Sequence, residues 1–311
     1  MKYKKIGVFL LSVVLPFCVS AAGEIKGYTS VTDKRLQNPE PSNWLQWRGN
    51  YEGWTYSPLD QINSKNVGDL APSWSYSTGV LEGHQAPPMV NNGVMFVATP
   101  QNQVIALDAN TGMEYWRYRK EIPEELFQLH PTSRGVALYG DMVYLAATDA
   151  CAVALDAKTG EEIWETCVAD WKEGYYMTLS PVAAEGVVMM GVSGGEYGIR
   201  GFVVALDAKT GKEAWRTHTI PGPGEYGHDT WPGDTWKTGG ASVWIAGTYD
   251  PELQIAYYGV GNGGPWMGDL RKGDNLYANS VLALDVHTGK IVGYHQFHWN
   301  ESWDWDEVSP P

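Results

Sequence analysis

The chain is poor in basic residues and in cysteine. Its 311 residues include 22 Lys or Arg against 36 Asp or Glu, which gives a formal net charge of −14. Nucleic acid is therefore not an expected partner, because binding to phosphates requires a basic face. Three cysteines are present, but no Cys-x-x-Cys-His sequence occurs, so these residues contain no attachment site for a c-type haem.

Long hydrophobic runs are also missing, except for one near the N-terminus. Three lysines among the first five residues precede an apolar run over 6–19, and small residues occupy 20–22. This pattern is typical of a secretory signal peptide, and the run is too short to span a membrane. We therefore expect residues 1–22 to be removed and residues 23–311 to be exported to the periplasm. Because the removed part carries three lysines and no acids, the net charge would fall from −14 to −17.

Four stretches of the chain repeat one phrase, which predicts a repeat architecture. They are VIALDANTGMEYWRY (104–118), AVALDAKTGEEIWET (152–166), VVALDAKTGKEAWRT (203–217) and VLALDVHTGKIVGYH (281–295). Successive copies start 48, 51 and 78 residues apart, measured between Asp108, Asp156, Asp207 and Asp285. The first two intervals match the length of a four-stranded propeller blade, so the third holds an insertion. We therefore predict an all-β protein, a β-propeller.

Each repeat is expected to form a β-hairpin. In the third copy, the apolar run 203–206 is typical of a buried strand, 207–211 of a tight turn, and 212–216 of the returning strand. An amphipathic helix is excluded, because no i, i+3, i+4, i+7 stripe continues through the Thr-Gly turn. Residues 74–78 are expected to form a first strand.

A tryptophan follows the repeat aspartate by eight residues in three copies, at Trp116, Trp164 and Trp215. On the returning strand, this large flat side chain can dock between neighbouring blades. The fourth copy has Gly293 in that place and Tyr294 beside it, so its contact with a neighbouring blade must differ.

Two cysteines, Cys151 and Cys167, flank the second repeat. If this hairpin pairs Asp156 with Glu162, Cys151 faces Cys167 across the two strands. A disulfide is then geometrically possible in an oxidising compartment, and two reduced, buried thiols are the alternative.

The strongest candidate for a binding site is the segment NESWDWDE, residues 300–307. If it is extended, Trp303 and Trp305 lie on one face. Asp304 and Asp306 then lie on the other face, about 7 Å apart, where both carboxylates could bind one cation. A solvated acidic turn would have the same composition, so this segment alone does not decide between the two.

Two further segments carry candidate ligands. In the sequence SGGE over 193–196, glycines would let a ligand approach the backbone, and Glu196 supplies an oxygen ligand. A plain hairpin turn is the alternative. Trp244 could form a stacking surface for a flat cofactor, and Asn262 could join a cation site, although ordinary strand residues would look the same.

Together these segments resemble one family. The phrases ALDAKTGKEAW, SGGEYGIRGF, YDPELQIAYYGVGN and WDWD resemble those of pyrroloquinoline quinone (PQQ)-dependent alcohol dehydrogenases, over about residues 44–311. The order and spacing of the motifs also match. The resemblance implies an eight-bladed propeller with PQQ and a metal ion on its axis, of which this chain covers roughly the first half. We expect this part alone to be inactive, because half a ring leaves strand edges unpaired.

The resemblance also implies roles for individual residues. Asp304 is implied as the catalytic base and as a metal ligand. The other implied metal ligands are Glu196, Asn262 and Asp306. The implied PQQ-binding residues are Arg134, Thr178, Ser193, Gly194, Gly195, Ser242 and Trp244, the last as the floor on which the ring stacks.

The chain departs from the family's pattern at a few positions. Gln128 and Leu129 stand where many members have adjacent cysteines that cover the quinone, and Gln85 stands where many have Glu. Asp306 resembles an extra aspartate of the lanthanide-dependent branch. A trivalent ion favours one more anionic ligand than Ca²⁺ does, so the sequence slightly favours a lanthanide over Ca²⁺.

The implied reaction is oxidation of a small alcohol by hydride transfer to metal-bound PQQ, with Asp304 as general base. Electrons would pass to a c-type cytochrome. The alternative is a non-enzymatic propeller, such as an outer-membrane assembly scaffold, built on the same tryptophan repeat. Such scaffolds lack the SGGE, GVGN and WDWD segments, so we favour the enzyme.

Overall fold

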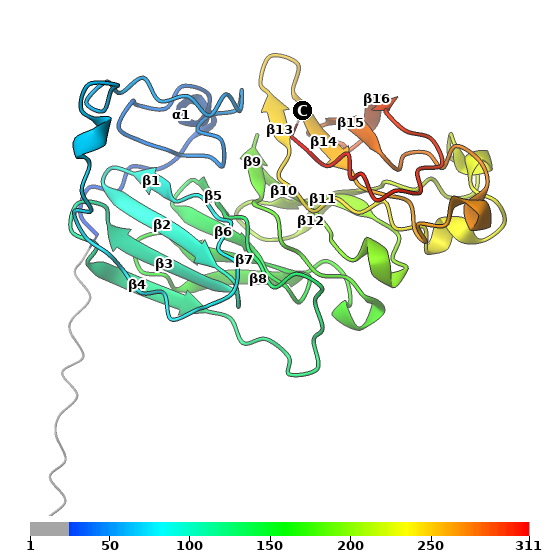
Figure 1. The fold of residues 1–311 in the computed structure, drawn as a ribbon, viewed down its shortest axis with the longest axis horizontal. Helices are drawn as coiled ribbons and strands as arrows, with labels where there is room; N and C mark the ends of the chain where they lie inside the picture. The colour runs from blue at the N-terminus through cyan, green and yellow to red at the C-terminus, as the bar shows by residue number, and fades with distance from the viewer. Residues whose placement is uncertain (1–24, 311) are drawn as a thin grey trace, which may run out of the picture.

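The computed structural model of the chain describes residues 25–310, and the predicted signal peptide lies outside them. Four antiparallel four-stranded sheets, which we call blades 1–4 in chain order, follow one another across the molecule (Figure 1). Blade 1 consists of β1 (Met89–Asn91), β2 (Val94–Thr99), β3 (Gln103–Asp108) and β4 (Glu114–Arg119). Blade 2 consists of β5 (Val136–Tyr139), β6 (Met142–Ala146), β7 (Cys151–Asp156) and β8 (Glu162–Cys167). Blade 3 consists of β9 (Val182–Ala184), β10 (Val187–Gly191), β11 (Phe202–Asp207) and β12 (Glu213–His218). Blade 4 consists of β13 (Thr248–Asp250), β14 (Ile255–Val260), β15 (Ser280–Asp285) and β16 (Ile291–Gln296).

Helical structure is limited to short segments. These are the α-helix α1 (Asp33–Gln37) and the 3-10 turns η1 (Val67–Asp69), η2 (Trp171–Glu173), η3 (Gly195–Tyr197), η4 (His228–Thr230), η5 (Thr235–Lys237) and η6 (Gly268–Arg271). Between residues 25 and 310, no helix is long and apolar enough to cross a bilayer.

Each blade is a meander whose first strand is innermost. Strand β5 contacts β1 and β9, and β9 contacts β13, so the first strands of the four blades stand side by side. The third and fourth strands, which come from the repeats, form the outer edge. This radial order is that of a propeller, and it confirms the predicted all-β architecture. It also brings the loops at one end of the inner strands together.

The repeat hairpins form as predicted, and the repeat aspartate closes each turn. In blade 3, Asp207 Oδ1 accepts hydrogen bonds from the amide and the hydroxyl of Thr210, at 2.8 and 2.7 Å. These hydrogen bonds favour the charged carboxylate and hold the pKa of Asp207 below its usual range. Asp108 and Asp285 accept the same bonds from Thr111 and Thr288.

The tryptophan of each of the first three repeats packs against the next blade. Its indole nitrogen donates to the carbonyl that follows the next repeat's aspartate, in the pairs Trp116–Ala157 (3.1 Å), Trp164–Ala208 (3.1 Å) and Trp215–Val286 (2.8 Å). The ring also covers the glycine of that repeat's turn. A Cβ on these glycines would lie only 2.4 to 2.7 Å from the ring, at Gly160, Gly211 and Gly289. The predicted docking between blades is therefore confirmed.

The predicted strand over residues 74–78 does not form, whereas the fourth copy departs from the tryptophan pattern as expected. No strand forms over residues 74–78, because no neighbouring chain among the described residues pairs with them. Trp74 nevertheless docks on blade 1 in the usual way, donating to Ala109 O at 3.2 Å. In the fourth copy, Gly293 pairs with Ala283 at the tryptophan's place. Tyr294 packs its ring on Tyr277 instead, with the ring centroids 4.8 Å apart.

Helix α1, which we did not predict, ties the N-terminal segment to blades 2 and 3. Asp33 accepts hydrogen bonds from the hydroxyls of Tyr51 (3.0 Å) and Tyr139 (2.6 Å). It also accepts one from the amide of Glu185 (2.8 Å). The hydroxyl of the buried Tyr51 donates in turn to Ala183 O (2.8 Å) at the inner strand of blade 3.

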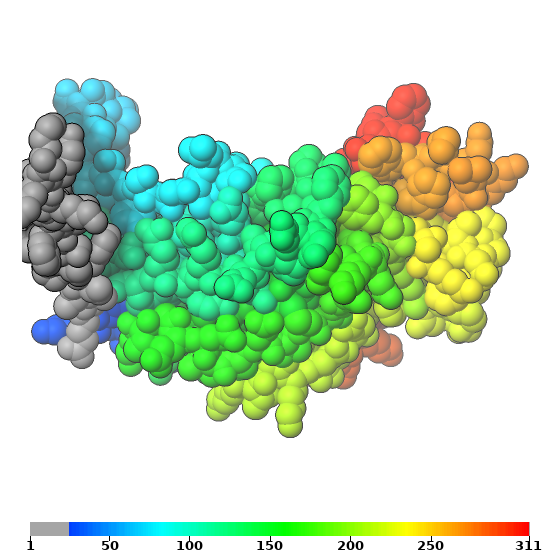
Figure 2. Space-filling model, turned by 90° about the horizontal axis from the view of Figure 1, so that it is seen from below, coloured from blue at the N-terminus to red at the C-terminus, as the bar shows by residue number. Residues whose placement is uncertain are grey.

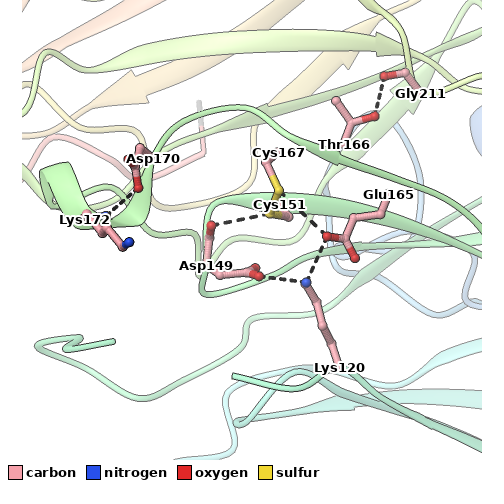
Figure 3. Close-up of a disulfide and its surroundings, with 9 residues drawn as sticks. All are labelled: Lys120, Asp149, Cys151, Glu165, Thr166, Cys167, Asp170, Lys172 and Gly211. Carbon is pink, nitrogen blue, oxygen red and sulfur yellow. Dashed lines mark hydrogen bonds and ion pairs between the residues drawn. A yellow bond between two sulfur atoms is a disulfide. The ribbon is translucent and has the colours of Figure 1, made fainter. Parts of the chain in front are cut away.

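Cys151 and Cys167 form a disulfide across β7 and β8 (Figure 3). They are register partners, but the predicted pairing of Asp156 with Glu162 is wrong. A β-bulge after Ala154 shifts the register, so Glu162 pairs with Leu155. Beside the disulfide, Lys120 of blade 1 forms ion pairs with Asp149 (2.7 Å) and Glu165 (3.1 Å) of blade 2.

Gly211→Ala should destabilise the protein more than Gly93→Ala. Both glycines have a left-handed φ, +69° and +78°, so both alanines carry a backbone cost of about 1–2 kcal/mol. At Gly211 the new Cβ would also lie 2.7 Å from the Trp164 ring, whereas nothing lies within 4 Å at Gly93. Overpacking should add about 1–3 kcal/mol to the loss, measurable by urea denaturation. Equal losses in the two variants would show that ring packing on Gly211 does not matter.

Replacing both cysteines by serine should lower the free energy of unfolding by about 2–3 kcal/mol, because the disulfide closes a loop and restricts the unfolded chain. The bond joins residues 16 apart in sequence. Reduction of the natural protein should reproduce the loss in the same urea titration. A double variant as stable as the oxidised protein would contradict this role.

Candidate functional site

A cavity of about 280 Å³ lies where the loops at one end of the inner strands meet. It is lined by nine of the residues singled out from the sequence: Arg134, Thr178, Ser193, Gly194, Glu196, Ser242, Trp244, Asp304 and Asp306. Two others do not line it. Gly195 lines an adjoining cavity of about 350 Å³, which shares Glu196 and Trp266 with the first. Asn262 lies behind Asp304 and contacts it.

The propeller topology explains why these distant residues meet. Arg134, Thr178 and Trp244 precede the inner strands β5, β9 and β13, while residues 193–196 and Asn262 follow β10 and β14. Backbone hydrogen bonds join these loops across blades. Arg134 N donates to Thr178 O (2.9 Å), and Val243 N donates to Val192 O (2.8 Å). Loops from blades 2, 3 and 4 thus form one wall.

One side of the cavity is cationic and hydroxyl-rich. Arg134 Nη1 donates to Thr178 Oγ1 (2.5 Å), which lies 3.1 Å from Ser193 Oγ. The guanidinium also lies over the Trp244 ring, 4.6 Å from its centroid. Burial lowers the pKa of Arg134, and no carboxylate of the described residues forms an ion pair with it. This side can therefore receive an anionic, flat ligand.

The backbone conformation and packing at position 194 require glycine. Its φ is +108°, and a Cβ there would lie 2.1 Å from the carbonyl oxygen of Gly174. The sequence suggested that this glycine makes room for a ligand. Close packing of two backbones requires it independently of any ligand.

The cavity lining also contains acidic residues. Burial raises the pKa of Asp306 to about 6, and the charges of Asp304 and Glu196 add to this, while a hydrogen bond with Trp244 opposes it. A cation between these groups would relieve the repulsion. The cavity lining thus contains both positive and negative groups, and the charge of Asp306 acts on Arg134.

The acidic segment is not extended as predicted. Asp304 and Asp306 have left-handed φ angles of 62° and 49°, which break the alternation of an extended strand. Both carboxylates still line the cavity, and the rings of Trp303 and Trp305 are 78% and 61% exposed. The two aspartates and the two tryptophans therefore point in different directions, as predicted. The extended backbone on which that prediction was based is not observed.

The candidate metal ligands lie near one another, but their ligand atoms do not surround one common point. Asn262 Nδ2 donates to the Asp304 carboxylate, and its Oδ1 accepts from the Asp306 amide (3.0 Å) and Asn279 Nδ2 (3.1 Å). We also looked for three His, Cys, Asp or Glu side chains whose ligand atoms all lie within 4.8 Å of one another. Within residues 25–310, the one such group is Glu165 with the two disulfide-bonded cysteines. The three cavity acids are therefore spaced more widely.

The cavity also contains residues that the sequence reasoning did not assign to it: His130, Tyr176 and Trp266. Tyr176 precedes Thr178 by two residues and could have been found by alternation along the loop. His130 and Trp266 carried no signal. Leu129 and Gln85, two of the departures from the family's pattern, line the cavity, and Gln128 does not.

Comparisons with known proteins point to one family. Residues 44–311 match the model of the family "PQQ: Glucose/ethanol/alcohol dehydrogenase, beta-propeller domain". The chain is 37% identical to quinoprotein alcohol dehydrogenase PedH of Pseudomonas putida, over 97% of this chain and 54% of that protein. It is 36% identical to the lanthanide-dependent methanol dehydrogenase of Methylacidiphilum fumariolicum, over 87% of this chain and 48% of that protein.

Solved structures show the same likeness. A europium-containing methanol dehydrogenase matches with a TM-score of 0.83 and 35% identity, over 88% of this chain and 52% of its own. Quinohemoprotein alcohol dehydrogenase ADHIIG of Pseudomonas putida matches with a TM-score of 0.84 and 37% identity, over 89% of this chain and 44% of its own. The chain thus spans about half the length of the relatives it matches. By sequence and by fold, it belongs to the glucose/ethanol/alcohol dehydrogenase family of PQQ β-propeller proteins.

Proposed function

We propose that the protein containing this chain oxidises an alcohol with PQQ and a bound metal ion. The observation that carries the proposal is one cavity lined by nine residues that were singled out from the sequence, seven of them in three separate motifs and two, Arg134 and Thr178, from the resemblance. When bound, PQQ and the metal ion would supply the hydride acceptor and a Lewis acid. One relative is named as a quinoprotein alcohol dehydrogenase, and another is named as a lanthanide-dependent methanol dehydrogenase.

The residues on the cationic side fit a quinone that carries carboxylates. Arg134 is partly buried, and no carboxylate of the described residues forms an ion pair with it, although the charge of Asp306 acts on it; its donors can therefore bind an anionic ligand. The hydroxyls of Thr178, Ser193 and Ser242 would bind its polar groups, and Trp244 would form the floor. The guanidinium of Arg134 now lies over the Trp244 ring. A quinone ring stacked on Trp244 would therefore share this surface with the guanidinium or displace it.

The acidic residues of the cavity fit a cation of high charge. Glu196, Asp304 and Asp306 supply carboxylates, and Asn262 supplies an amide oxygen, all of them hard ligands. Mutual repulsion contributes to the raised pKa of Asp306, and a bound cation would reverse this effect. Binding would replace the hydrogen bond that now joins Asn262 to Asp304.

Asp304 is proposed to take the proton from the alcohol hydroxyl. It is an exposed carboxylate at the cavity, held by Asn262 and by a left-handed backbone. A nearby cation would keep it ionised and able to accept a proton. Leu129, Trp266 and His130 would limit the space left for substrate.

The setting of the reaction is also a proposal. The predicted signal peptide supports export to the periplasm, and the acidic net charge would attract a basic c-type cytochrome as electron acceptor. A non-enzymatic scaffold would not need the charged cavity, and membership of a dehydrogenase family argues against it.

Asp304→Asn in the complete protein should lower turnover at least about 100-fold, because an amide cannot accept the proton. PQQ should remain bound, as judged from its absorbance band after removal of free quinone. Asp269→Asn makes the same chemical change at an exposed site on η6 and should leave turnover unchanged. Retained activity in Asp304→Asn would remove this residue from the base role.

Reconstitution with PQQ and La³⁺ should give faster alcohol oxidation than reconstitution with PQQ and Ca²⁺, because Asp306 adds a fourth anionic or amide ligand. Asp306→Asn should reverse this preference, since the smaller negative charge suits a divalent ion better. The rate of dye-linked oxidation of primary alcohols is measured for the natural protein and for Asp306→Asn. Activity of the natural protein with Ca²⁺ alone would reject the preference for a lanthanide.

A further inference from the structure

The segment that carries Asp304 is held by an arginine that lies completely inside the protein. Arg271 ends the 3-10 turn η6 and has no exposed surface. Its Nε donates to Pro265 O (2.8 Å) and its Nη1 to Asn275 Oδ1 (2.6 Å). Its Nη2 donates to the carbonyl of Glu301, three residues before Asp304. One guanidinium thus joins three stretches of chain.

The same guanidinium packs against the residue that follows Asn262. A Cβ on Gly263 would lie 2.8 to 3.0 Å from three guanidinium atoms, so the contact requires glycine. Arg271 therefore touches backbone next to Asn262 on one side and near Asp304 on the other. These two side chains are themselves hydrogen-bonded at the cavity.

Neighbouring hydrogen bonds strengthen this arrangement. Asn300 Nδ2 donates to Arg271 O (3.0 Å) and to Asn275 Oδ1 (3.0 Å). Asn275 Nδ2 donates in turn to Thr230 O (3.1 Å), in the Pro- and Gly-rich loop 221–235. In the space-filling view, this loop (yellow) and the segment around η6 (orange) lie together at one end of the molecule (Figure 2).

The role of Arg271 is geometric rather than one of charge pairing. All three acceptors are neutral, and no carboxylate of the described residues forms an ion pair with it. Burial lowers its pKa, which the charge of Glu301 only partly opposes. A guanidinium carries five N–H donors in one rigid plane, whereas the ammonium of lysine is a single point that cannot reach three separated acceptors.

We propose that Arg271 is a positioning residue that holds Asn262 and Asp304 at the separation needed to bind one cation. It contacts neither the cavity nor a reacting group. The inference rests on the proposed function only in assuming that this cavity binds a metal ion.

Terbium luminescence tests the proposal without measuring catalysis. Tb³⁺ is titrated into the complete, metal-free protein, with emission excited through tryptophan, since Trp244 and Trp266 line the cavity. R271K and R271M should bind Tb³⁺ about 10- to 100-fold more weakly than the natural protein, the usual effect of removing a group that orients ligands. R216K is the control, because Arg216 pairs with Glu213 on the outer strand of blade 3.

Activity measured against metal concentration gives a second readout. R271K should need more metal for half-maximal turnover, while turnover at saturating metal stays near that of the natural protein. A merely structural role would lower thermal stability and leave metal affinity unchanged, which would overturn the proposal. Weakening confined to R271M would assign the effect to charge and would overturn it as well.

If R271K does not fold, the variant N300G tests the proposal in its place. Asn300 has a φ of 47°, which glycine adopts freely, so this change removes only the side-chain amide, which donates to Gly268 O, Arg271 O and Asn275 Oδ1. N300G should also weaken Tb³⁺ binding, and unchanged binding would refute the proposal. A natural protein that binds neither Tb³⁺ nor PQQ would instead refute the proposed function itself.

Discussion

The junction between blades consists of an indole that covers a glycine and donates its N–H to a carbonyl beside it. A four-stranded sheet cannot bury both of its faces alone, so each blade depends on its neighbour. The tryptophan supplies a large apolar surface, and its one polar atom is satisfied by the carbonyl. The repeat encodes both halves of this contact. Its Asp-Thr-Gly turn forms the receiving surface, and its tryptophan docks on the next blade.

The stacking of blades determines the shape of the candidate site. Since the inner strands stand side by side, the loops before β5, β9 and β13 converge with those after β10 and β14. Arg134 comes from one of these loops and the acids Asp304 and Asp306 from a later segment, so opposite charges face one cavity. An anionic quinone and a cation together would complement these charges. Either one alone would leave the charged groups of one sign without a ligand of opposite charge.

The WDWD segment is placed by contacts that have no counterpart in the repeats. Asp304 and Asp306 adopt left-handed conformations, which cost energy in any residue other than glycine. The segment keeps them because Asn262 binds one carboxylate and the amide of the other, and Arg271 holds the preceding carbonyl. Local alternation of residue types could not predict this backbone, since distant hydrogen bonds override the preference for an extended chain.

Local patterns were sufficient for the hairpins, the tryptophan docking and the list of candidate ligands. Each of these depends on a short sequence whose geometry is nearly independent of its surroundings, such as the turn closed by Asp207 and Thr210. The bulge after Ala154, the unpaired segment 74–78 and the direction of the Asn262 amide required the folded structure. The sequence alone thus determined the repeat, the blade and the list of candidate ligands. Tertiary structure decided how they face one another, because those contacts join residues that are far apart along the chain.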